Sequence, residues 1–298
     1  MTKIILVAGA SGNLGGRICR EIIKRGGRVR AAVRHSADPE KNQALIKMGV
    51  ELIEVDYNNA SEIEYACQDV NCVVSALAGL SEVIVGLQKR LLDASVSAGV
   101  PRFIPSDFCT DYTKLVAGEN RNFDLRRQFR DLLDSSSIKA CSIFNGAFAD
   151  ILKYNTPVLN LKDKSISFWG DRQDWKLDFT TMDETAAFTA EAALDDQVPR
   201  ALHIASFQVS PSKIHEIVGE VTGKEFKLQQ LSSLRDFAES IQKLRAAYPA
   251  GELELYAKWQ QAQYMYSMFT TQHPKLDNMR YSGIFWTPAA DYISSFAK

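Results

Sequence analysis

The stretch ILVAGASGNLGGRI, residues 5–18, decides the fold. An apolar run leads into a loop in which Gly9, Gly12 and Gly15 recur at every third position, and helical spacing follows directly. In such a context the three glycines allow a tight turn, close approach of the backbone to a pyrophosphate, and close helix–strand packing. The N–H groups that open the helix then face the phosphates. The predicted cradle comprises Gly9, Ser11, Gly12, Asn13, Leu14 and Gly15; the alternative is a permissive turn without a ligand.

Outward from this loop, apolar runs alternate with segments of helical spacing. The predicted strands cover residues 3–8, 28–33, 50–55, 69–77, 102–105 and 140–144. The predicted helices cover residues 14–25, 38–49, 60–68, 82–98 and 122–135. Strands and helices in strict alternation predict an α/β protein with a doubly wound parallel sheet and right-handed crossovers, the NAD(P)-binding Rossmann fold.

The rhythm changes after about residue 150, where aromatic residues become frequent. Thr181 and Glu184 form a capping-box pattern before a helix over 184–194, and Ser210-Pro211 begins a helix that ends near Gly223. Helices are also predicted over 231–246, 251–270 and after Thr287-Pro288. We therefore expect a Rossmann domain over 1–150, to which 178–206 returns, and a smaller mixed C-terminal substrate lobe over 151–298 packed on the sheet.

Composition excludes several classes of protein. The 298 residues carry a formal net charge of -1, so neither a basic field for nucleic acid nor an acidic tail is present. Five cysteines without a CxxC pattern indicate neither a disulfide framework nor a zinc site. The N-terminus lacks a signal-peptide layout, and no apolar stretch approaches the roughly 20 residues of a membrane span. We expect a soluble cytoplasmic protein without metal, nucleic-acid or membrane partners; no feature distinguishes a monomer from an oligomer.

The end of the second predicted strand indicates which dinucleotide binds. NAD-selective sites place an acid about 20 residues past the loop, but here Arg34 stands 19 residues after Gly15. A guanidinium suits a 2′-phosphate in charge and in bidentate geometry, so NADP(H) is favoured over NAD(H). The alternative is a solvated surface arginine. Asp56, after the third strand, fits either a contact on the adenine side or a helix N-cap. Further contacts are expected from the end of the fourth strand, at Ser75, Ala76 and Leu77.

With these positions placed, the sequence resembles the NmrA-like and isoflavone reductase-like branch of the atypical short-chain dehydrogenases. The matching residues are GASGNLGG (9–16), Arg34, VDYNNASEIEYACQDVNCVVSAL (55–77) and PRFIPSDF (101–108). The resemblance covers about residues 1–150, and extends weakly through 144–152 and 178–186. It implies a Rossmann domain, NADP(H), a pocket for aromatic or other small carbonyl-type substrates, and cofactor contacts from Pro105, Ser106 and Phe108.

The proton donor departs from the known patterns. None of the ten tyrosines has a lysine four residues on, which excludes the Tyr-x-x-x-Lys mechanism of typical short-chain dehydrogenases. The reductases that this chain resembles use a lysine in the helix after the fifth strand, where alignment places Arg126. An arginine is a poor general acid, but it can polarise a carbonyl as a fixed cation. The alternative is a solvated helix face. The four histidines are far apart in sequence and suggest no catalytic or metal-binding arrangement.

Aromatic residues near the predicted turns suggest a substrate pocket. An apolar, aromatic wall with few polar groups is usual for small-molecule sites. The predicted wall comprises Phe108, Phe144, Phe148, Trp169 and Trp175, although some of these residues could instead belong to the core. Two functions follow: an NADP(H)-dependent reductase of a hydrophobic or aromatic carbonyl, quinone or enone, or a non-catalytic NmrA-like protein that senses NAD(P). A sensor requires unequal affinity for the two redox forms of the cofactor.

Overall fold

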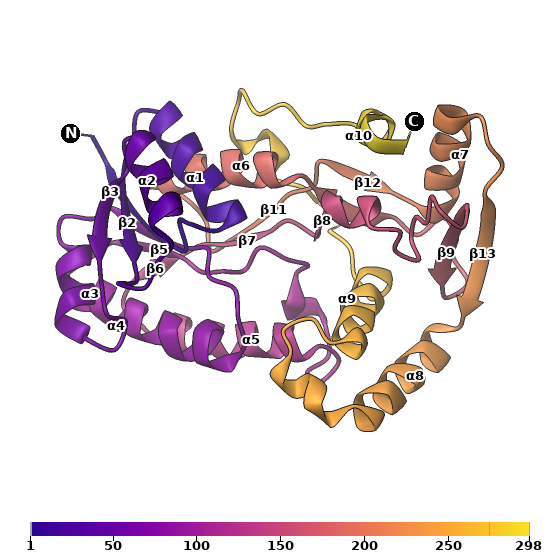
Figure 1. Ribbon diagram of the computed structural model, residues 1–298, viewed down its shortest axis with the longest axis horizontal. Coiled ribbons are helices and arrows are strands. Elements are labelled where there is room, and N and C mark those ends of the chain that lie inside the picture. The colour runs from indigo at the N-terminus through magenta and orange to yellow at the C-terminus, as the bar shows by residue number, and fades with distance from the viewer. Residues whose placement is uncertain (1, 274, 298) are drawn as a thin grey trace. The chain divides into compact units, whose positions relative to one another are not determined.

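A six-stranded parallel sheet organises the first part of the chain (Figure 1). The computed structural model describes residues 2–273 and 275–297. The sheet order is β3-β2-β1-β4-β5-β6. Strands β2 and β3 are therefore added on one side of β1, and strands β4 to β6 on its other side, so the switch point lies between β1 and β4. The strands are β1 (Ile4–Ala8), β2 (Arg28–Val33), β3 (Glu51–Glu54), β4 (Cys72–Ser75), β5 (Arg102–Ile104) and β6 (Lys139–Ala140). This is the predicted doubly wound α/β fold, which the structure confirms, and ligands bind such sheets at the switch point.

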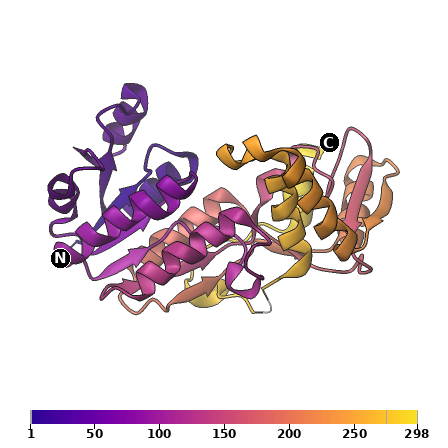
Figure 2. The same cartoon turned by 90° about the horizontal axis from the view of Figure 1, so that it is seen from below.

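Helices cover both faces of this sheet. Figures 1 and 2 show α1 (Asn13–Lys24) and α2 (Pro39–Lys47) on one face, with α3 (Ala60–Cys67) and α4 (Gln88–Ser97) on the other. The apolar stripe of α1 buries Ile18, Cys19 and Ile22, as its helical spacing predicts. Asp38 caps α2 by accepting from the amide of Glu40. The element types through residue 135 agree with the sequence prediction.

Two details of the first part differ from the prediction. The predicted helix over 82–98 opens with a π-helix, η1 (Glu82–Leu87), before α4 begins. The predicted strand over 140–144 is broken. Cys141 still donates to the carbonyl of Phe103, but Ser142 donates to the carbonyl of Arg200. The chain therefore leaves the large sheet after β6, and β7 (Ser142–Phe144) pairs instead with β11 (Ala201–His203).

The chain divides into two compact units. The first comprises Met1–Phe108, Leu125–Ile143 and Thr185–Leu202, and the second comprises Cys109–Asp124, Phe144–Glu184 and His203–Lys298. Helices α5 (Arg121–Asp134) and α6 (Met182–Leu194) each run from the second unit into the first. The first unit has its main apolar core around β1, β4 and β5, where Leu6, Val73 and Phe103 are fully buried.

The second unit holds small sheets and several helices. Its sheets have the orders β12-β10-β8 and β13-β9. Its strands are β8 (Ala147–Phe148), β9 (Ser165–Trp169), β10 (Leu177–Thr180), β12 (Phe207–Val209) and β13 (Lys227–Ser232). Its longer helices are α7 (Pro211–Thr222), α8 (Leu234–Ala247), α9 (Lys258–Thr270) and α10 (Ala289–Ala297). Short helices lie at η2 (Tyr112–Lys114), η3 (Ala149–Lys153), η4 (Pro249–Leu253) and η5 (Asn278–Arg280).

Tertiary contacts shift two predicted helix boundaries in this unit and change one predicted capping box. The predicted helix over 231–246 begins only at Leu234, because the preceding residues pair with β9. The predicted helix over 251–270 is broken before α9, because the guanidinium of Arg121 donates hydrogen bonds to the carbonyls of Gly251 and Glu254. The amide of Glu184 donates to Thr181 Oγ1 (3.2 Å), as a capping box requires. The carboxylate of Glu184 instead accepts from Thr287.

Among residues 2–273 and 275–297, no helix is long and apolar enough to cross a membrane. All five cysteines are free thiols, and all are buried.

Candidate functional site

Two glycines of the loop, Gly9 and Gly15, leave no space for a Cβ. Gly9 has a φ of +85°, and a Cβ on it would lie 2.6 Å from the carbonyl oxygen of Ala76. A Cβ on Gly15 would overlap the carbonyl oxygen of Gly9. Gly12 is the N-cap of α1 and has extended backbone, and it provides no side-chain capping hydrogen bond to the start of this helix. The loop and the open helix terminus together form a cradle that fits a pyrophosphate.

A groove beside the loop carries cations that the sequence analysis missed. It has a volume of about 260 Å³ and lies between α1 and α2. Arg17, Arg20 and Lys41 line it together with the loop residues Ser11 and Gly12, and none of its lining residues is acidic. The signal was present in the sequence, because Arg17 and Arg20 are one helical turn apart on α1.

Arg34 and His35 follow β2 directly and have different surroundings. Arg34 is exposed, and within the described ranges no carboxylate lies within 4.0 Å of its guanidinium. His35 lies 3.1 Å from Glu54 and 3.5 Å from Glu62, and the hydrogen bond with Glu54 is the main cause of its raised pKa. Arg34 is therefore an exposed cation without an ion pair among the described residues.

Asp56 is exposed in the turn after β3, and it does not cap a helix. Its carboxylate accepts from the amide of Asn58, whereas Asn59 accepts from Ser61 and is the N-cap of α3. The N-cap alternative for Asp56 is therefore wrong. The cofactor-contact alternative stays a prediction.

The ends of β4 and β5 lie close together in the first unit. Ser75 is fully buried, and Ala76 donates to the carbonyl of Ala8 on β1. Ser106 follows β5, and its hydroxyl donates to the carbonyl of Leu77 (2.6 Å). Pro105 and Phe108 flank it, and both are buried. The residues predicted from strand ends are therefore assembled at one edge of the sheet.

Arg126 also contacts Ser106. Its Nε donates to the carbonyl of Ser106 (3.0 Å), and the side chain is only half-buried. Arg126 is therefore a fixed cation beside the loop after β5. Its predicted catalytic role is not decided by this contact.

The predicted aromatic wall is dispersed over different surroundings. Phe144 is 2% exposed and stacks against His203, with ring centroids 5.3 Å apart. Trp169 stacks on Phe237 in the core of the second unit, so the core alternative fits its packing. Trp175 is partly buried, and its indole N–H donates to the carbonyl of Met268. Phe148 is half-buried on β8 and Phe108 is buried.

The structure brings two histidines together, which the sequence analysis did not predict. His203 Nε2 donates to Asp111 Oδ2 (2.9 Å), and the rings of His203 and His273 lie 4.9 Å apart. Burial opposes the charge of Asp111, but hydrogen bonds from His203 and Thr113 outweigh it and lower its pKa. Burial lowers the pKa of His273 to about 3, so this imidazole is neutral at pH 7. Within the described part of the chain, no group of three or more His, Cys, Asp or Glu side chains could hold a metal ion.

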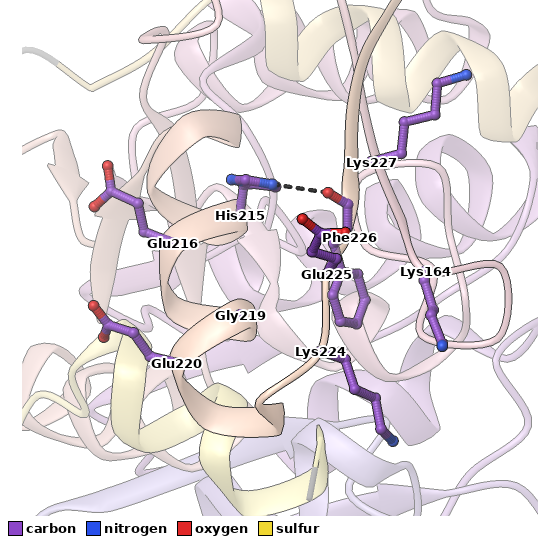
Figure 3. Close-up of a pocket in the computed structure, with 9 residues that line it drawn as sticks. All are labelled: Lys164, His215, Glu216, Gly219, Glu220, Lys224, Glu225, Phe226 and Lys227. Atoms are coloured by element: carbon purple, nitrogen blue, oxygen red, sulfur yellow. Dashed lines mark hydrogen bonds between the residues drawn. The ribbon is translucent and has the colours of Figure 1, made fainter.

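A cavity of the second unit lies away from these predicted residues. It has a volume of about 750 Å³ beside α7 and the start of β13. Figure 3 shows His215 directed at the carbonyl of Phe226, and Glu216 and Glu220 on the far side of α7. The charged residues are exposed and carry both signs; they are Lys164, Glu216, Glu220, Lys224, Glu225 and Lys227. None of the residues predicted for cofactor or substrate lines this cavity.

Comparison with known proteins decides the family. The family model described as the NmrA-like family matches residues 1–280. The chain belongs to the NmrA-like family. This confirms the resemblance seen in the sequence, and it places the glycine loop in a family context rather than in an isolated motif.

Relatives of this NmrA-like protein include named reductases. Pinoresinol reductase 1 of Arabidopsis thaliana is 27% identical over 272 residues, covering 83% of each chain. Isoflavone reductase of Pisum sativum is 28% identical over 224 residues, covering 67% of this chain and 69% of that one. The solved structure of AtPrR2 with NADP+ and (+)pinoresinol has a TM-score of 0.82 at 23% identity, covering 99% of each chain. The last comparison shows the fold.

Proposed function

We propose that this NmrA-like protein is an NADPH-dependent reductase of a small hydrophobic or aromatic carbonyl, quinone or enone. The observation that carries the proposal is the glycine loop Gly9–Gly15, in which Gly9 and Gly15 leave no space for a Cβ, with the exposed cation Arg34 directly after β2. Named reductases among the relatives support the same chemistry. Free buried thiols are typical of a reducing compartment, so we assign the protein to the cytoplasm.

Each part of the site has a task in this proposal. The bound cofactor supplies the hydride. The amides of the glycine loop hold the pyrophosphate, and Arg34 binds the 2′-phosphate. The ends of β4 and β5 hold the rest of the cofactor through the backbone of Ala76 and Ser106. We assign residues 1–150 and 178–206 to the cofactor and residues 151–298 to the substrate, with Phe148 and Trp175 as part of its wall.

Arg34→Ala is expected to remove the preference for the phosphorylated cofactor. Loss of a charge-assisted contact to a phosphate weakens NADPH binding by about 10-fold or more, while NADH binding changes little. The measurement is a binding titration of NADPH, NADP+, NADH and NAD+. Arg28→Ala is the matched control, since Arg28 is exposed at the start of β2 but lies 3.9 Å from Glu51. Equal affinities of the wild type for NADPH and NADH would contradict the assignment.

The same titration tests the alternative function, a non-catalytic NmrA-like protein that senses NAD(P). The absence of Tyr-x-x-x-Lys and the arginine at position 126 favour this alternative. A sensor must bind NADP+ and NADPH unequally, because a ligand shifts a population only through differential affinity. Similar affinities for both redox forms support the reductase. Strong preference for one form, together with no turnover of aromatic carbonyls, supports the sensor.

Arg126→Ala is expected to lower turnover far more than cofactor affinity. A fixed cation that polarises the substrate carbonyl acts mainly in the transition state, so roughly a 100-fold loss in kcat is expected. Arg130→Ala is the control, since Arg130 is on the same helix but pairs with Asp134. Unchanged turnover would exclude a catalytic role for Arg126. A gain of activity in Arg126→Lys would indicate that the lysine used by related reductases has been lost in this chain.

A further inference from the structure

We propose that Gln88 is a positioning residue for the cofactor, acting through Ser106. Gln88 is the first residue of α4 and is 1% exposed. Its side-chain Oε1 accepts from the amide of Ser106 (3.0 Å), and its Nε2 donates to the carbonyl of Ile84 (2.7 Å). The proposal deepens the proposed function, on which it rests. It assigns a role to a residue that the sequence analysis did not single out.

Ser106 is held at each of its polar groups. Its amide donates to Gln88, its hydroxyl donates to the carbonyl of Leu77, and its carbonyl accepts from Arg126. These three partners come from α4, the end of β4 and α5, so one residue connects three elements of the first unit. The next amide, that of Asp107, donates to the carbonyl of Pro105 (2.8 Å), which makes the turn tight. Hydrogen bonds therefore constrain the loop after β5 at both Ser106 and Asp107.

The π-helix η1 determines where Gln88 lies. A π-helix inserts extra residues per turn, is rare, and often occurs at functional sites. Here it runs over Glu82–Leu87 and ends directly before Gln88, whose amide donates to the carbonyl of Val83, five residues earlier. An α-helical path over the same residues would rotate Gln88 about the helix axis. The amide group of Gln88 would then lose its alignment with Ser106.

The side-chain oxygen of Gln88 matters for cofactor binding because it is the hydrogen-bond acceptor of a buried backbone amide. The amide of Ser106 is in a buried environment, so without Gln88 it would lack a partner or would move toward one. The loop over 105–108 contains three predicted cofactor contacts. A shift of this loop therefore reaches the cofactor without any direct contact between Gln88 and the ligand. This is why we describe Gln88 as positioning and not as catalytic.

The test compares Gln88→Met with a matched control. Methionine keeps the length of the side chain but offers no comparable hydrogen bond, so Gln88→Met is expected to bind NADPH roughly 10-fold more weakly. In the cofactor-free protein, hydrogen exchange at the amide of Ser106 is expected to accelerate by a similar factor. Gln260→Met is the control: Gln260 is 0% exposed and donates to Asn120 in the second unit. It should lower Tm without changing either readout.

Gln88→Glu is the second variant, in case the methionine variant folds poorly. Glutamate in its protonated form keeps an acceptor for the amide of Ser106 and a donor for the carbonyl of Ile84, so this variant is expected to bind NADPH within about threefold of the wild type. Wild-type NADPH affinity in Gln88→Met would overturn the proposal, as would unchanged exchange at Ser106. If the wild-type protein binds no NADPH in the titration, the proposed function is overturned. The positioning role of Gln88 is then overturned with it.

Discussion

Gly9→Ala is expected to abolish tight NADPH binding and to destabilise the first unit. Two effects add at this position. An alanine at a φ of +85° has left-handed backbone strain of about 1–2 kcal/mol. Its Cβ would also lie 2.6 Å from the carbonyl oxygen of Ala76, a backbone atom of a neighbouring strand end that cannot rotate away. Forcing such a contact costs roughly 1–3 kcal/mol more, through movement of the loop that we assign to the phosphates.

Gly49→Ala separates the two effects. Gly49 has a similar φ of +91°, but a Cβ on it would meet nothing within 4 Å. This control variant therefore has the backbone strain alone, and its NADPH affinity should equal that of the wild type. The measurements are the NADPH dissociation constant and the free energy of unfolding in urea. If Gly9→Ala binds NADPH as Gly49→Ala does, the close approach of the loop to Ala76 is not required for the cofactor.

Acid is expected to destabilise the second unit well above the pKa of ordinary carboxylates, because of His273. This histidine is 1% exposed, neither ring nitrogen has a hydrogen-bond partner among the described residues, and burial lowers its pKa to about 3. In the unfolded chain a histidine titrates near pH 6.5. Between these values the unfolded state binds the additional proton. The free energy of unfolding therefore falls by up to about 1.4 kcal/mol for each unit of pH lost.

Neighbouring groups change this slope in known directions. The pKa of Asp111 is lowered, so its contribution to stability is lost only as the pH falls below the ordinary carboxylate range. Burial raises the pKa of Asp178, which lies 3.7 Å from His273 Nδ1, and this opposes the slope just above pH 4. The lowered pKa of His273 and the raised pKa of Asp178 both disfavour a charged His273–Asp178 pair. The part of the slope nearest pH 6.5 is therefore the least affected by these two carboxyl groups and reports mainly on His273.

His273→Leu tests this attribution. Leucine fills a similar volume without a titratable group, so the loss of stability between pH 7 and pH 5 should become markedly smaller. The measurement is urea unfolding at several pH values, followed in the full chain. His35→Gln is the control, because the pKa of His35 is raised and its removal should not flatten the acid limb. An unchanged slope in His273→Leu would place the acid sensitivity elsewhere.

Local sequence patterns were sufficient where the energetics are local. Helix boundaries with side-chain caps, such as Asp38 for α2 and Ser210 for α7, agree with the structure because the capping groups lie within three residues of each other. The strand β2 and the helix α1 follow from apolar periodicity. The glycine loop could be predicted because glycine is required at positions 9 and 15, where a Cβ would clash with the other glycine or with Ala76 after β4.

Helix and strand boundaries that depend on partners distant in sequence could not be predicted. Nothing near residue 254 shows that the guanidinium of Arg121 binds that carbonyl and ends a helical pattern. Nothing near residue 231 shows that β9 extends a strand at the expense of a helix. In both cases a partner distant in sequence stabilises the backbone more than local propensity does.

The sequence by itself determined the sheet, the family resemblance and the phosphate cradle, because each rests on short-range patterns. Only the tertiary structure decided that Gln88 holds Ser106, 18 residues further along the chain. It alone brought His203 and His273 together, 70 residues apart. Hydrogen bonds and burial of this kind depend on how the chain folds back on itself, and single residues such as glutamine and histidine carry no local pattern that records it.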